Sequence, residues 1–160
     1  MDRMAKILLL NMCMIIDELN NKVLVQDKVG KKWSGITFPG GHIENAESII
    51  ESTIREVHEE TGLTVEKLQP CGLIDWCNAE SNERWFVFLF KTTHFTGTLL
   101  EETEEGKVFW TDLEQLAGLK LAPGMDTYLE LFFHDDVNEA YATWNENAHS
   151  ENAHSDFRVI

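Results

Sequence analysis

The chain has few cysteines and no long apolar segment. Its 160 residues include three cysteines, Cys13, Cys71 and Cys77. Their number is odd and no C-x-x-C pair is present, which argues against a disulfide scaffold and against a zinc or redox site built from cysteines. No run approaches the roughly 18 apolar residues that a membrane-spanning helix requires. The apolar segment 7–16 also lacks a small-residue cleavage site, so we expect a reducing, cytoplasmic location.

Positive charge is scarce as well. The 13 Lys and Arg residues stand against 28 Asp and Glu, which gives a formal net charge of −15. Because nucleic acid polymers and anionic membranes repel such a chain, we expect neither as the main partner. A small phosphate ligand would need additional positive charge at its site.

The length is typical of one domain, and a hydrophobic content of 43% predicts a folded chain. We place this domain at residues 1–143. A polar tail follows at 144–160 and contains the pentapeptide E-N-A-H-S twice in tandem.

Local patterns predict an α+β domain with layered strands and helices. Apolar or alternating segments predict strands at 4–16, 22–27, 65–76, 84–92 and 108–110. Helical periodicity predicts helices at 46–61, 112–117 and 126–133, and each of the two short helices begins with an Asp that can cap it. This order of strands and helices is typical of an α+β or layered α/β fold.

The segment 46–61 has the end signals of a helix. Asn45 is a favourable N-cap, and Glu47 then falls in the first turn, where a carboxylate complements the helix dipole. Gly62 occupies the position where a left-handed residue ends a helix. One face is suited to packing and comprises Ala46, Ile50, Thr53, Ile54, Val57 and Thr61.

A second face of this helix gathers negative charge. At 100° per residue, Glu56, Glu59 and Glu60 fall within an arc of about 100°. Such like charges destabilise a helix by roughly 0.2–0.5 kcal/mol per pair, and Arg55 can offset part of this through Glu51 and Glu59. Clustered carboxylates are suitable ligands for Mg²⁺, although a solvated acidic face is the alternative explanation.

The full pattern decides between these explanations, because residues 41–63 resemble the Nudix box, G-x5-E-x7-R-E-U-x-E-E-x-G-U, in which U is apolar. The matching residues are Gly41, Glu47, Arg55, Glu56, Val57, Glu59, Glu60, Gly62 and Leu63. The resemblance implies the Nudix fold, in which a mixed β-sheet is sandwiched between α-helices and the box forms a loop–helix–loop.

The same resemblance implies the roles of the box residues. Glu56, Glu59 and Glu60 would ligate Mg²⁺ or Mn²⁺ together with the carbonyl of Gly40, and Arg55 would orient the glutamates. The reaction would be attack of water on a phosphorus of a nucleoside diphosphate derivative. The metal would lower the pKa of a bound water, and a carboxylate such as Glu59 or Glu60 would take its proton.

An acidic loop at 101–105 supplies a further catalytic candidate. In several Nudix relatives a loop glutamate about five residues before a tryptophan approaches the metal site as a base or an extra ligand. Glu105 has this spacing from Trp110, and Glu104 is its rival. A solvated loop is the alternative explanation for this charge.

The length of the chain and the segment 123–131 are similar to Nudix members that hydrolyse oxidised purine nucleoside triphosphates. Asp126 would then read the base edge, unless it only caps its helix. Ser34 stands where some of those enzymes carry Asn, which weakens the prediction of 8-oxo-guanine readout. Further candidates for phosphate or base contacts are Lys28, Lys32, Phe38, Trp76, Trp85 and, on the first strand, Asn11.

The sequence therefore predicts Mg²⁺-dependent hydrolysis of a nucleoside triphosphate, such as 8-oxo-dGTP or a related oxidised purine nucleotide, to a monophosphate and pyrophosphate. Two alternatives stay open: a Nudix pyrophosphatase acting on ADP-ribose or a dinucleoside polyphosphate, and a non-catalytic Nudix ligand-binding module. The expected partner is a small nucleotide, and a homodimer through an exposed sheet edge stays open as well.

Overall fold

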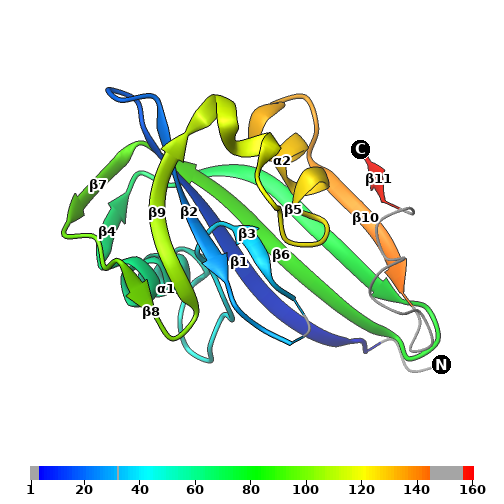
Figure 1. Ribbon diagram of the computed structural model, residues 1–160. Helices are drawn as coiled ribbons and strands as arrows, with labels where there is room; N and C mark the ends of the chain where they lie inside the picture. Colours follow the sequence, from blue (N-terminus) through cyan, green and yellow to red (C-terminus); the bar gives the residue numbers. More distant parts are fainter. Residues whose placement is uncertain (1–3, 32, 145–156) are drawn as a thin grey trace.

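A large mixed sheet forms the body of the molecule (Figure 1). The computed structural model describes residues 4–31, 33–144 and 157–160. The strands of the large sheet are β1 (Lys6–Asp17), β2 (Lys22–Lys28), β3 (Gly35–Thr37), β5 (Gln69–Asn78), β6 (Glu83–Thr92), β8 (Glu102–Thr103), β9 (Gly106–Asp112), β10 (Glu139–Trp144) and β11 (Arg158–Val159). Their spatial order is β11-β10-β5-β6-β1-β2-β9-β8, and β3 pairs with β2 beside this row. A separate two-stranded sheet joins β4 (Leu63–Glu66) and β7 (His94–Gly97).

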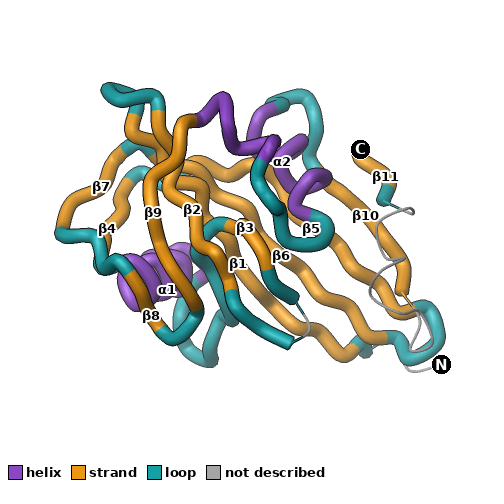
Figure 2. Tube along the Cα trace, viewed as in Figure 1, coloured by secondary structure: helices purple, strands orange, loops and turns teal. Residues whose placement is uncertain are grey.

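The helices cover the two faces of the large sheet. They are α1 (Ile49–Thr61), α2 (Met125–Phe133) and the short 3₁₀ helix η1 (Leu113–Gly118). Two buried clusters of apolar side chains lie on the two sides of the sheet, one with Val57 of α1 and the other with Phe132 of α2. The two longer helices therefore lie on opposite faces (Figure 2), which confirms the predicted sandwich.

Strand β1 is the centre of this arrangement. It runs parallel to β6 over ten residue pairs and pairs antiparallel with β2 only at its end, so the sheet is mixed. Met12 and Met14 face the α2 cluster, whereas Cys13 and Ile15 face the α1 cluster. A strand buried on both faces requires a nearly continuous apolar run, which is the pattern that predicted it.

Several predicted elements differ in detail. The segment 65–76 contains the end of β4 and most of β5 rather than one strand, because Lys67 between them has a left-handed φ of 51°. The segment 112–117 forms the 3₁₀ helix η1, and Asp112 pairs with Lys22 at 2.9 Å instead of capping through its side chain. Helix α2 has Gly124 at its N-cap, so the prediction that Asp126 caps it is wrong.

Strands β3, β7, β8, β10 and β11 were not predicted. β11 lies within the segment that we expected to be a polar tail, and it pairs antiparallel with β10. The tandem E-N-A-H-S repeat lies at residues 146–155, outside the described residues.

All three cysteines are free. Burial raises the pKa of the Cys71 thiol to about 11 and that of Cys13 further, so both thiols stay protonated near neutral pH. Among the helices that the structure describes, none has the length and apolar character needed to span a bilayer.

Candidate active site

Helix α1 begins at Ile49, three residues later than predicted. Its N-cap is Ser48, whose hydroxyl accepts from the Glu51 N–H at 3.1 Å, while the Glu51 carboxylate accepts from the Ser48 N–H at 2.9 Å. Ala46 has a left-handed φ of 66° and is outside the helix. The prediction of Asn45 as the cap is therefore wrong, and the S-x-x-E signal of a capping box at 48–51 would have located the start.

The far end of α1 agrees with the prediction. Gly62 has a φ of 77°, and its N–H donates to the His58 carbonyl. A Cβ at this position would lie 2.5 Å from the carbonyl oxygen of Thr98, so both conformation and space require glycine.

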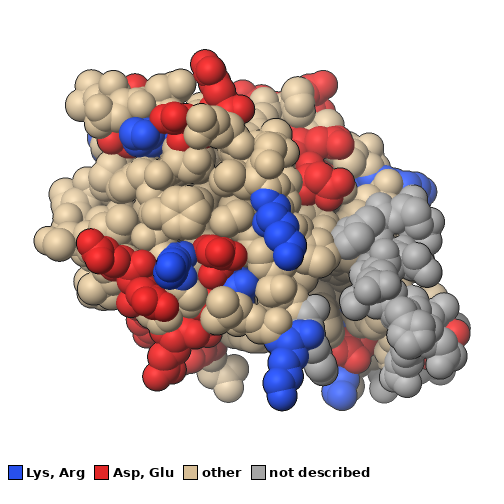
Figure 3. All heavy atoms as spheres, in the orientation of Figure 1, with Lys and Arg blue, Asp and Glu red and all other residues tan. Residues whose placement is uncertain are grey.

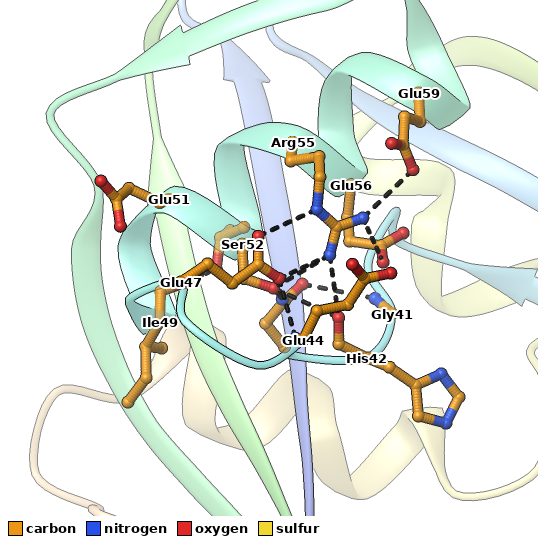
Figure 4. A network of polar contacts seen from close by, with 12 residues as sticks. Gly41, His42, Glu44, Glu47, Ile49, Glu51, Ser52, Arg55, Glu56 and Glu59 are labelled. Carbon is orange, nitrogen blue, oxygen red and sulfur yellow. Dashed lines mark hydrogen bonds and ion pairs between the residues drawn. The ribbon is translucent and has the colours of Figure 1, made fainter.

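Glu47 precedes the helix and binds Arg55 in a two-point contact (Figure 4). Arg55 donates from Nε to Glu47 Oε2 at 3.0 Å and from Nη2 to Oε1 at 2.7 Å. Hydrogen bonds from Arg55 and from the Glu44 N–H lower the pKa of Glu47 to about 2. Arg55 Nη2 also donates to the carbonyl of His42, whose imidazole points away from the guanidinium. The prediction that Glu47 lies in the first helical turn is wrong; its carboxylate fastens the loop before α1 to the helix.

The other side of the Arg55 guanidinium contacts two of the box glutamates. Nη1 donates to Glu56 Oε1 at 2.9 Å and to Glu59 Oε2 at 3.2 Å. The predicted contact with Glu59 is confirmed, and the predicted contact with Glu51 is wrong because Glu51 caps the helix. Arg55 therefore holds carboxylates on both sides, which is the geometry of an orienting residue.

Two glycines allow the loop to approach the glutamates closely. A Cβ on Gly41 would lie 2.6 Å from the Glu56 carboxylate, and a Cβ on Gly40 would overlap the carbonyl oxygen of Asn11. Glu56 is largely buried beneath this loop, with a side-chain exposure of 15%.

Glu60 is the most buried of the three glutamates, with an exposure of 7%. Its Oε2 accepts a hydrogen bond from the Gly40 N–H at 2.9 Å, the one hydrogen bond that it receives from the residues that the structure describes. Burial raises the pKa of Glu60 to about 7, although the Gly40 N–H and the charge of Lys28 act in the opposite direction. A carboxylate taken out of water with so little compensation is a site that a cation would stabilise.

The acidic loop meets this site through Glu105. Its carboxylate forms an ion pair with Lys28 at 3.0 Å, and its carbonyl accepts from the Val29 N–H at 3.0 Å. The charges of Glu105 and Glu56 both raise the pKa of Glu60, which places Glu105 near the box glutamates. Figure 3 shows acidic side chains gathered around β8 and α1, with basic atoms among them.

The donor set suits a hard divalent cation, although its oxygens are not gathered around one point. Among the described residues, no three His, Cys, Asp or Glu side chains are arranged as a metal site. Arg55 engages Glu56 and Glu59, whereas Glu60 turns to Gly40. The three carboxylates nevertheless supply the oxygen ligands that Mg²⁺ and Mn²⁺ prefer, and the charge of Lys28 and the Gly40 N–H compensate the burial of Glu60 only in part.

Asn11 has a structural role that the sequence pattern did not reveal. It is 3% exposed, its N–H donates to the Gly41 carbonyl at 2.9 Å, and its Oδ1 accepts from the Gly41 N–H at 3.3 Å. Its Nδ2 donates to Ser52 Oγ at 2.9 Å. A buried asparagine in an apolar strand was the available signal, and its hydrogen bonds position the loop before the box.

The predicted substrate residues are less closely grouped than the box. Phe38 is 2% exposed and packs edge-on against Phe132 with ring centroids 5.0 Å apart, which contradicts its expected substrate contact. Ser34 is exposed, and Lys32 lies outside the described residues. Asp126 lines a groove of about 290 Å³ between η1 and α2, and its carboxylate makes no hydrogen bond or ion pair with another described residue.

Trp33 connects the loop before the box to the start of α2. Its Nε1 donates to the Pro123 carbonyl at 2.8 Å. The Lys28 ammonium lies 6.0 Å from the centroid of the Trp33 ring. Lys28 therefore lies between Glu105 and an aromatic ring at the edge of the box.

Comparisons with known proteins agree with this geometry. Residues 9–132 match the family model described as the NUDIX domain, and the chain therefore belongs to the Nudix family of hydrolases. It is 34% identical over 110 residues to the uncharacterized Nudix hydrolase YvcI of Bacillus subtilis (strain 168), a match that covers 67% of this chain and 68% of that protein.

A second relative is the oxidized purine nucleoside triphosphate hydrolase of Mus musculus, which is 34% identical over 97 residues. This match covers 61% of the chain but only 59% of the mouse protein, less than two thirds of its length. Among solved structures, the mutator MutT protein from Bacillus halodurans superposes with a TM-score of 0.76 at 28% identity, covering 95% of this chain and 97% of that one.

Proposed function

We propose that this protein hydrolyses a nucleoside triphosphate to a nucleoside monophosphate and pyrophosphate, using Mg²⁺ or Mn²⁺, with 8-oxo-dGTP or a related oxidised purine nucleotide as the substrate. The observation that carries the proposal is the buried, incompletely compensated Glu60 beside Glu56 and Glu59 on α1. The name of the mouse relative supports the choice of substrate.

The proposed mechanism divides the work among the box residues. Glu56, Glu59, Glu60 and the Gly40 carbonyl would hold the cation, which when bound polarises a phosphate group and lowers the pKa of a water ligand. Arg55 keeps Glu56 and Glu59 on the side of the helix that faces the loop.

Glu105 and Lys28 complete the proposed chemistry. The Glu105 carboxylate would accept the proton of the attacking water. Lys28, which is bound to Glu105 at 3.0 Å, would exchange this partner for a substrate phosphate.

The base would stack on aromatic side chains of the α2 face. Trp85 is 38% exposed and pairs with Leu8 of β1. Two residues further along β1, Leu10 forms a β-bridge with His42 of the loop before α1. Strand spacings place Trp85 about 8 Å from Leu10, within reach of a nucleotide whose phosphates lie at the box.

We further propose a cytoplasmic location and a small nucleotide, rather than a nucleic acid polymer, as the partner. The strongly acidic composition supports the second point, since a long polyanion would be repelled. Size-exclusion chromatography with light scattering decides whether the chain is a homodimer.

A product-resolved substrate panel tests the proposed function. Canonical and oxidised nucleoside triphosphates, ADP-ribose and dinucleoside polyphosphates are each incubated with the protein, with Mg²⁺ or with EDTA. We expect pyrophosphate from the triphosphates in Mg²⁺ and none in EDTA. AMP from ADP-ribose or from a dinucleoside polyphosphate would instead identify the other pyrophosphatase activity. Ligand-induced stabilisation without any hydrolysis would identify a binding module.

Two variants tie this activity to the site. Glu59→Gln and Glu60→Gln each remove a carboxylate of the set, and turnover should collapse while the circular dichroism spectrum is retained. The matched control is Glu130→Gln, which changes an exposed glutamate of α2. Undiminished pyrophosphate release by both site variants would contradict the proposed mechanism.

A further inference from the structure

A row of side chains crosses the α2 face of the sheet and ends at the last described residues. Trp85 on β6 is in register with Trp76 on β5, and Trp76 is in register with Ala142 on β10. Continuing the antiparallel register of β10 and β11 by one residue places Phe157 opposite Ala142. The row therefore runs from the exposed Trp85 to Phe157 across four strand positions.

The small size of Ala142 allows Phe157 to reach Trp76 across β10. Ala142 is buried at 1% exposure, and its methyl group leaves the space above β10 free for a larger ring. Phe157 fills that space and meets the Trp76 ring edge-on, with centroids 4.6 Å apart and an interplanar angle of 70°. Edge-to-face contacts at this spacing are favourable beyond the area that they bury.

Trp76 is held from a second side by α2. Its Nε1 donates to the hydroxyl of Tyr128 at 3.1 Å. The Tyr128 ring also meets the Phe157 ring edge-on, with centroids 6.4 Å apart. Phe157 and Tyr128 therefore fix the position of Trp76 together.

Phe157 is itself anchored by backbone hydrogen bonds of the strand that follows it. The Ile160 N–H donates to the Glu139 carbonyl at 2.8 Å, and the Glu139 N–H donates back to the Ile160 carbonyl at 3.0 Å. Arg158 lies over the Tyr141 ring, 5.0 Å from its centroid. Because successive side chains of a strand point to opposite faces, Arg158 lies on the other face of the sheet from Phe157.

We propose that Phe157 is a positioning residue for nucleobase selection, acting through Trp76. By fixing Trp76 beside the exposed Trp85, it maintains a wide aromatic surface that favours a purine over a pyrimidine. Trp144 packs against Trp85 with ring centroids 5.0 Å apart and supports the same surface. The inference rests on the proposed function, because it assigns the base of the substrate to this face.

The test compares Phe157→Ala with Arg158→Ala, which changes the neighbouring side chain on the opposite face of the same strand. Steady-state kinetics are measured for purine and pyrimidine deoxynucleoside triphosphates in Mg²⁺. For Phe157→Ala we expect KM for purines to rise about tenfold with kcat within about twofold, and KM for pyrimidines to change by less than about threefold. Arg158→Ala should match the unmodified protein, and Phe157→Leu should recover part of the purine preference.

The outcomes separate this inference from the proposed function. If the unmodified protein hydrolyses triphosphates and the folded Phe157→Ala and Phe157→Leu variants keep its purine preference, the role of Phe157 is refuted and the proposed function stands. If the unmodified protein hydrolyses no triphosphate, the proposed function fails. Quenching of tryptophan fluorescence by purine and pyrimidine nucleoside monophosphates then decides the role of Phe157. Quenching that is selective for purines in the unmodified protein and lost in Phe157→Ala supports that role. The same quenching pattern in both proteins, or no quenching in either, refutes it.

Discussion

Two regions of the molecule differ in how their contacts are made: the box segment around α1, and the aromatic face under α2. The aromatic face comprises Trp76, Trp85, Tyr128, Trp144 and Phe157. The box is polar, and its ion pairs with Arg55 join residues that lie within eight positions of one another. The aromatic face is apolar and joins residues as distant as Trp76 and Phe157. One region orients charges with hydrogen bonds, and the other fixes rings by packing, so we expect mutations in the two regions to affect different properties.

The largest effect is expected in the packed region. Phe132 is fully buried and meets Phe38 edge-on, so Phe132→Ala should lower the free energy of unfolding by about 3–5 kcal/mol. Denaturant unfolding measures this change. Phe133→Ala is the matched control, because this neighbouring ring is 44% exposed. Equal costs for the two variants would contradict the assignment of Phe132 to the core.

In the box the corresponding change should affect activity rather than stability. Gly41→Ala places a methyl group 2.6 Å from the Glu56 carboxylate, which must move. Because displacements of about 1 Å at a catalytic group cost on the order of 100-fold, we expect kcat/KM to fall by about that factor. Gly118→Ala is the control, since nothing lies within 4 Å of its added methyl group. If both alanine variants are equally active, the close approach of Gly41 has no catalytic role.

The buried charge of Glu60 predicts a pH dependence of stability in the metal-free protein. Its pKa is about 7 in the folded state against an ordinary value of 4.5, so the folded protein binds the proton more tightly. The free energy of unfolding should therefore fall as the pH rises from about 4.5 to about 7.

Glu60→Gln removes this penalty and should stabilise the metal-free protein at pH 8 by about 1–3 kcal/mol. The two proteins should be closest in stability below pH 5. Thermal unfolding in EDTA across this pH range provides the measurement. A constant difference between the two proteins at every pH would show that the charge of Glu60 is not the cause.

The smallest effect concerns the start of α1. Ser48→Ala removes the hydroxyl that caps the helix and should lower the free energy of unfolding by about 1 kcal/mol. Asn45→Ala should change it by no more than a few tenths, because Asn45 precedes the cap by three residues. The reverse order of the two costs would restore Asn45 as the cap.

The contrast between the regions also explains what the sequence could predict. The box was predictable because residues 41–63 match the Nudix box pattern along one continuous stretch of chain, and the contact of Arg55 with Glu59 and the end of α1 at Gly62 were both confirmed. The strands 84–92 and 22–27 were predictable from their apolar or alternating patterns.

The remaining features depend on contacts between distant residues. The pairing of Phe157 with Trp76 needs the register of β5, β10 and β11, which no local pattern contains. Phe38 is buried because α2 brings Phe132 against it from 94 positions away, so a candidate for stacking became a core residue. The prediction of Asn45 as the cap was wrong for a local reason, because the capping box at 48–51 starts the helix three residues later.

The parallel pairing of β1 with β6 has a consequence for the synthesis of the protein on the ribosome. Lys6 pairs with Glu83 and Ile15 with Thr92, so the partner of the first strand is synthesised much later. At ribosomal rates of about 5–20 residues per second, the nascent β1 waits on the order of ten seconds before β6 emerges. During that interval an apolar strand has unpaired backbone groups and is open to aggregation. The strand at the centre of the finished sheet is therefore a segment that the growing chain must shield for a long interval.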